Sequence, residues 1–163
     1  MARKNARNHY RTGLTLIEIL IVTALIAIFA GFGLISLLGR RSKTEVESTA
    51  RQIVGLLREA QSHSMSQSSS TGWGVRFSNA TGTVPFYAMF AGSSYAPSGE
   101  TGHYRLPERV FYVTSTIASG AVKDVSFSQI TGAPSTSTTV GIVGFGGTIS
   151  STISISSSGL INF

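Results

Sequence analysis

The sequence predicts an α+β protein in which a long N-terminal helix, with a membrane-spanning first half, packs on a small antiparallel β domain. Residues 14–38 form an apolar run with a single charge in it. Beyond residue 70 the hydrophobic period falls from three or four residues to two, with turn residues between the apolar segments. We therefore divide the chain into a leader, a membrane-spanning helix, an amphipathic continuation of that helix, and a β-rich domain. Their bounds are 1–13, 14–38, 39–70 and 71–163.

The leader is basic, without an acidic residue, and ends at Gly13. The apolar run that follows is long enough to cross a bilayer, which takes about 20 residues. Its one charge is Glu18. A central carboxylate costs roughly 2.5–3.5 kcal/mol on insertion scales, while each Leu or Ile returns about 0.3–0.6, so the helix is expected to insert. Because the leader holds more basic residues than the other flank, we expect it to be cytoplasmic.

The apolar run is expected to continue as one helix from about Leu14 to about Ser66. No proline interrupts residues 14–84, and apolar residues recur at three- and four-residue steps from Val46 to Ala60. Gly31 and Gly33 are weak points in this helix. They are either points of flexibility or positions of close contact between membrane helices.

The segment after residue 70 reads as short strands separated by turns. Trp73, Val75 and Phe77 alternate with smaller or polar residues, and a second alternation through 84–90 follows a turn at 79–82. This predicts a hairpin whose inner face carries Phe86, Ala88 and Phe90. A loop is expected at 92–103. Further strands are expected at 110–114, 124–128, 138–143, 148–156 and 160–163.

Composition excludes several kinds of chemistry. The chain has no cysteine, so disulfides, cysteine nucleophiles and thiolate metal sites are absent. Of the three histidines, His9 lies in the leader, and His63 and His103 lack ligand-like neighbours in the sequence. Without the leader the chain carries nine basic and seven acidic residues, and no basic cluster indicates nucleic-acid binding. We expect no enzymatic activity, no catalytic residues, no cofactor and no metal.

The junction from Arg11 to Glu18 resembles the class III signal of type IV prepilins and type II secretion pseudopilins. The resemblance implies that a prepilin peptidase cleaves between Gly13 and Leu14 and methylates the new amine of Leu14. Leu14 stands where the family usually has phenylalanine. Glu18 would be the family's fifth-position glutamate, which compensates the N-terminal amine of a neighbouring subunit during assembly.

Residues 72–77, 87–90 and 106–107 look like the globular domain of the H-type minor pseudopilin. The likeness implies a structural minor subunit of a type II secretion pseudopilus or a closely related type IV pilus, acting in protein secretion or filament assembly. Expected partners are the prepilin peptidase, other pilins or pseudopilins, an inner-membrane assembly platform, and membrane lipid before assembly. The expected location is a single-pass inner membrane protein with an extracytoplasmic domain. The alternative is a pilus-borne binding module, either an adhesin or a DNA-uptake minor pilin.

Overall fold

The computed structural model describes residues 15–68 and 71–163, without the side chains of 31–41. Helix α1 is assigned over Leu16–Met65. The chain forms two compact units, Met1–Gly39 and Arg40–Phe163. A short 3-10 helix, η2 (Pro97–Gly99), precedes β3. The strands are β1 (Trp73–Ser78), β2 (Phe86–Ala91), β3 (Glu100–Arg105), β4 (Val110–Tyr112), β5 (Val122–Phe127), β6 (Thr138–Gly144), β7 (Ser150–Ile155) and β8 (Ile161–Asn162).

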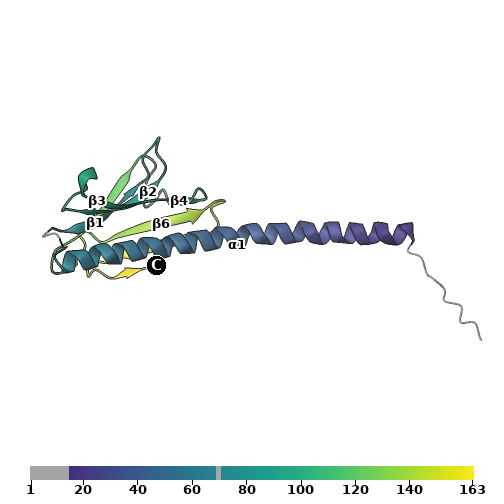
Figure 1. Ribbon diagram of the computed structural model, residues 1–163, viewed down its shortest axis with the longest axis horizontal. Coiled ribbons are helices and arrows are strands. Elements are labelled where there is room, and N and C mark those ends of the chain that lie inside the picture. The colour runs from purple at the N-terminus through teal and green to yellow at the C-terminus, as the bar shows by residue number, and fades with distance from the viewer. Residues whose placement is uncertain (1–14, 69–70) are drawn as a thin grey trace, which may run out of the picture. The chain divides into compact units, whose positions relative to one another are not determined.

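The described strands form two four-stranded antiparallel sheets. The first has the order β3-β2-β1-β5 and the second β4-β6-β7-β8. Figure 1 shows β6 running beside the C-terminal part of α1. The inner faces of both sheets and one face of this helix share a single hydrophobic core.

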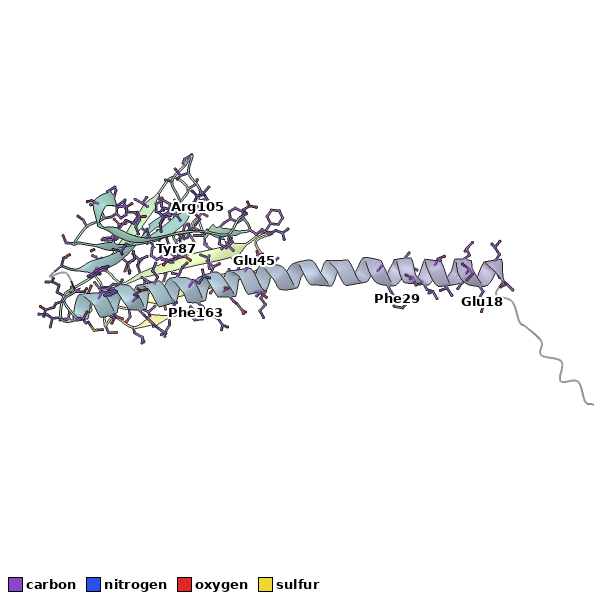
Figure 2. The ribbon with its side chains drawn as sticks, viewed as in Figure 1. Glu18, Phe29, Glu45, Tyr87, Arg105 and Phe163 are labelled. Atoms are coloured by element: carbon purple, nitrogen blue, oxygen red, sulfur yellow. The ribbon has the colours of Figure 1, made fainter. Side chains whose placement is uncertain are left out.

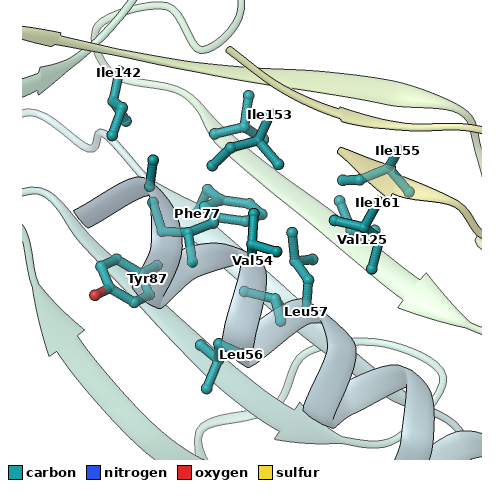
Figure 3. Packing of buried hydrophobic residues seen from close by; sticks show 14 of the residues in the cluster. Val54, Leu56, Leu57, Phe77, Tyr87, Val125, Ile142, Ile153, Ile155 and Ile161 are labelled. Atoms are coloured by element: carbon teal, nitrogen blue, oxygen red, sulfur yellow. The ribbon is translucent and has the colours of Figure 1, made fainter. Parts of the chain in front are cut away.

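The helical part of the core follows the predicted three- and four-residue spacing. Val46, Ala50, Ile53, Leu57 and Ala60 are at most 1% exposed. They meet alternate residues of the strands, because successive side chains of a strand point to opposite faces. Figure 3 shows this packing. The strand residues in it include Val75, Phe77, Val125, Ile142, Ile153 and Ile155.

Polar side chains near the end of α1 tie the helix to the strands and turns. Gln61 donates from Nε2 to the carbonyl oxygens of Gly132 and Gly159, each at 2.9 Å. Ser64 is fully buried; its hydroxyl accepts from the backbone N–H of Trp73 at 2.8 Å and donates to the Phe127 carbonyl at 3.2 Å. Because buried polar groups are costly when unpaired, these bonds fix how the helix lies in the core.

The expected membrane span at 14–38 is contradicted. Within the described residues, no helix combines the length and the apolar character that crossing a membrane requires. The described side chains of α1 fall into the stretches 16–30 and 42–65. The second carries exposed charges on one face. The transmembrane and inner-membrane assignments, with the extracytoplasmic placement, are therefore wrong on this finding.

The predicted fold class needs the same correction. Its membrane-spanning first half is not found among the described residues. The described antiparallel strands are arranged in two four-stranded sheets. The pilin-like class, which depended on a long N-terminal helix with a membrane-spanning first half, is therefore contradicted. The two alternatives for Gly31 and Gly33 stay predictions, because the surroundings of residues 31–41 are not described.

The predicted hairpin forms, with Trp73, Val75 and Phe77 inward as expected, but its second strand has the opposite face inward. Strands β1 and β2 pair in antiparallel register, with Val75 opposite Met89 and Phe77 opposite Tyr87. Tyr87 and Met89 belong to the main core, whereas Phe86 and Phe90 lie on the other face. There Phe90 meets Tyr95 edge-on, with ring centroids 5.6 Å apart. The alternation of aromatic residues predicted the wrong inner face for β2, because the loop after β2 covers the outer face and also buries an aromatic side chain there.

Gly55 offers a direct test of the helix. A Cβ built at this position meets no heavy atom within 4 Å, and glycine inside a helix costs up to about 1 kcal/mol relative to alanine. Gly55→Ala should therefore raise the free energy of unfolding by about 0.5–1 kcal/mol, measured by urea denaturation. Gly74→Ala is the matched control and should destabilise, since its Cβ would lie 2.6 Å from Phe90 Cζ and the Val125 carbonyl oxygen. Lower stability of Gly55→Ala would mean that something occupies the space beside Gly55.

Candidate functional site

The first described stretch of α1 carries an unusually apolar surface. Its large hydrophobic side chains are between 46% and 84% exposed. Surface patches of this kind on monomeric proteins mark interaction sites. We call this surface the apolar helix stretch; its members are Leu16, Ile17, Ile19, Leu20, Ile21, Val22, Leu25, Ile26, Ile28 and Phe29.

Thr15 caps the start of the helix, and Glu18 lies in its first turn. The backbone N–H of Glu18 donates to the Thr15 hydroxyl at 3.3 Å. A Thr followed three residues later by Glu is the sequence pattern of a capping box, and a carboxylate is favourable at a helix N-terminus. Sequence reasoning missed this local role of Glu18, although the Thr-x-x-Glu spacing signals it. Gly13 and Leu14, the predicted cleavage and methylation residues, lie outside the described residues.

A chain of polar contacts crosses the outer face of the first sheet. Arg76 binds Asp124 through two hydrogen bonds of 2.7 and 2.6 Å, and its guanidinium lies 3.8 Å from the Tyr95 ring centroid. The Tyr95 hydroxyl donates to Glu100 at 2.6 Å, and His103 Nδ1 lies 2.8 Å from the same carboxylate. The bond from Tyr95 holds the pKa of the Glu100 carboxyl below its ordinary value. These contacts hold the loop after β2 against the sheet.

Two histidines have clear structural roles. His103 stacks on Phe86 with ring centroids 4.3 Å apart, in addition to its contact with Glu100. The expectation that His103 lacks such neighbours is therefore wrong. His63 stacks on Trp73 at 4.6 Å. Within the described part of the chain, no three His, Asp or Glu side chains gather as a metal ion would need.

A groove lies between α1 and the strands β2 and β3. Its volume is about 360 Å³, and Tyr87 and Tyr104 stack along it with ring centroids 5.5 Å apart. The Tyr87 hydroxyl donates to Gln52 Oε1 at 3.1 Å, and burial raises the pKa of this tyrosine. In Figure 3 the Tyr87 hydroxyl points away from the core cluster. We call this feature the tyrosine groove; it is lined by Gln52, Gly55, Leu56, Glu59, Tyr87 and Tyr104.

A second surface feature lies where β4 and the β6–β7 turn meet. Phe145 is 67% exposed and Phe111 is 45% exposed. The Arg109 guanidinium lies 5.8 Å from the Phe145 ring centroid, and the Arg109 carbonyl accepts from the Phe145 N–H at 2.8 Å. The turn itself connects two strands, as predicted for 144–147, and Gly147 takes a positive φ of 75° there. We call Arg109, Phe111 and Phe145 the aromatic knob.

Figure 2 shows the described side chains and labels Phe29 of the apolar helix stretch, Glu18 near the start of the same helix, and Tyr87 of the tyrosine groove. No family model matches this chain, and no curated protein or solved structure matches it either. The function is therefore argued from the chemistry of these surfaces and from the N-terminal junction.

Proposed function

We propose that this chain is a structural subunit of a filament, of the minor pseudopilin kind, in a type II secretion pseudopilus or a closely related type IV pilus. The observation that carries the proposal is the apolar helix stretch. It follows directly after a junction, Arg11 to Glu18, that resembles the class III signal of prepilins. A prepilin peptidase would cleave between Gly13 and Leu14 and so place Glu18 near the new N-terminus.

Burial of these apolar side chains would drive such helices to associate side by side. Fully burying one Leu or Ile side chain contributes about 1.5–3 kcal/mol. Half of that for each of ten side chains is on the order of 10 kcal/mol, which is comparable with the roughly 4–15 kcal/mol that association costs. Packing against the equivalent helices of other pilins or pseudopilins therefore accounts for a surface that would otherwise remain in contact with water.

Glu18 would fix the axial register between neighbouring helices in this arrangement. An apolar contact alone lets helices slide, because it is non-directional. A carboxylate within an apolar bundle is costly unless it is paired. The methylated amine of Leu14 on a neighbouring subunit offers the opposite charge, and the pair forms only at one axial offset.

Glu18→Ala should therefore reduce incorporation into filaments while leaving cleavage after Gly13 intact. The capping bond uses the backbone N–H of Glu18 and the side chain of Thr15, so the helix start survives this change. The measurement is crosslinking of the full chain to other filament subunits in the producing cell.

Thr15→Val is the matched control, since it removes the cap and keeps the carboxylate. It should leave crosslinking close to that of the unchanged chain. Glu18→Gln keeps hydrogen bonding without the charge, so a defect like that of Glu18→Ala would assign the effect to electrostatics. If Glu18→Ala crosslinks to other subunits as much as the unsubstituted chain does, the proposed assembly role of Glu18 is refuted.

A further inference from the structure

We propose that two copies of this chain bind head to tail, with the aromatic knob of one copy in the tyrosine groove of the next. Both surfaces belong to the unit Arg40–Phe163. The contact is therefore separate from the helix packing proposed above and goes beyond it.

The groove is shaped to receive an aromatic side chain. Tyr87 and Tyr104 form an aromatic wall, and the nearly buried Leu56 adds an apolar surface. Gly55 leaves its part of the groove open, because no heavy atom lies within 4 Å of a Cβ built there. The space beside Gly55 is therefore open to a side chain from outside the unit.

The knob has the composition of an interface hot spot. Arginine is enriched at such sites, and phenylalanine is enriched at protein interfaces. Phe111 and Phe145 are both well exposed. Phe111 follows Arg109 by two residues, and Phe145 contacts Arg109 through the turn. Among the described residues, Arg109 makes no ion pair within its own chain.

Charge complementarity selects a second copy as the occupant. Glu59 lines the groove, and no Lys or Arg does. The ionic contact of Glu59 in the described part of the chain is His63 at 3.8 Å, which carries charge only when protonated. When an aromatic ring of the knob of one copy enters the groove of the next copy, Arg109 of the first copy comes within reach of Glu59 of the second. A two-fold dimer through the groove would instead place Glu59 opposite Glu59, which like charges disfavour.

The two surfaces lie at different heights along the helix axis. The backbone at Gly144, next to Phe145 in the turn, lies against Val46, whereas the groove is centred on Gly55 and Leu56. About 14 Å of helix separate these levels. A contact between unlike surfaces displaced along one axis is heterologous and leaves a free groove and a free knob at the two ends.

The chain has no cysteine, so engineered thiols report this contact without background. Ser62→Cys marks the groove side, one helical turn after Glu59, and Thr148→Cys marks the knob side, close after Phe145; both positions are exposed. Two full-length chains, one with each substitution and a different tag, are mixed in mild detergent that disperses the apolar helix stretch. They are then treated with a short bis-maleimide.

The Ser62–Thr148 heterodimer should form at least about tenfold faster than one between Ser62→Cys and the exposed control Thr152→Cys on β7. Glu59→Lys in the groove chain or Arg109→Glu in the knob chain should each abolish that difference, and the two together should restore it. Circular dichroism verifies that each variant is folded. Equal rates with Thr152→Cys, a dominant Ser62–Ser62 product, or indifference to the charge exchange would overturn the proposal. Glu18→Ala leaves this crosslink unchanged if the two contacts are independent.

Discussion

A fragment of residues 40–163 should fold on its own, whereas a fragment of residues 72–163 should aggregate. The first keeps the helical face that closes the core, and the second exposes the inner faces of both sheets to water. The described structure assigns Arg40–Phe163 to one compact unit. The boundary that matters for folding is therefore near residue 40, at the start of the amphipathic part of the helix.

The size of the effect follows from the residues lost. Val46, Ile53 and Leu57 are at most 1% exposed, and burying each contributes about 1.5–3 kcal/mol. These three alone amount to roughly 5–9 kcal/mol, as much as the whole stability of many domains of about 5–15 kcal/mol. Removing the helix also leaves the Trp73 N–H without the Ser64 hydroxyl that it binds at 2.8 Å.

Size-exclusion chromatography and thermal melting followed by circular dichroism test the two fragments. The longer one should be monodisperse and melt cooperatively. Ile53→Asp in that longer fragment is the matched control: it keeps the helix but places a charge in the core, so it should behave like the truncation. A monodisperse, cooperatively melting fragment 72–163 would show that the helix is not part of the core.

Strong hydrophobic periodicity predicted much of the unit 40–163. The spacing from Val46 to Ala60 identified the helical face that the core buries, and the alternation from Trp73 to Phe77 identified β1. Strands β4, β5, β6, β7 and β8 lie within a few residues of their expected bounds. In these segments burial of alternate residues is the dominant force, and the sequence records it directly.

Strand β3 shows where that method fails. Residues 92–103 were expected to form a loop, yet Glu100–Arg105 pairs with β2 at the edge of the sheet. Its six residues include Glu100, His103 and Arg105, and most are exposed. An edge strand with charged side chains has no apolar alternation to detect, although charges are how natural sheets protect their edges.

The candidate surfaces were less predictable than the strands. The tyrosine groove combines residues from α1, β2 and β3, so it needs the tertiary structure and the strand that the sequence concealed. The apolar run was visible at once, but length and composition alone indicated a bilayer as its surroundings. The described residues contain no helix suited to that. An apolar surface predicts that something buries it, but the sequence of one chain does not identify the partner that does so.

Gly13→Val should block processing of the chain. If a prepilin peptidase cleaves after Gly13, a β-branched side chain at that position crowds the scissile bond and restricts the backbone around it. The substituted chain should keep its leader, and its first residue after Gly13 should carry no methyl group. Intact-mass measurement of the protein purified from the producing cell reads both changes in one spectrum.

Thr12→Val is the matched control, because it introduces the same side chain one position earlier and leaves the glycine in place. It should yield the processed chain beginning with methylated Leu14. The unchanged protein should do the same, and Glu18→Ala should be processed as well. Retention of Met1 in the unchanged protein, or a first residue beyond 38, would refute cleavage between Gly13 and Leu14. Since that cleavage creates the amine that Glu18 is proposed to pair with, Gly13→Val should also lose the crosslinks that depend on Glu18.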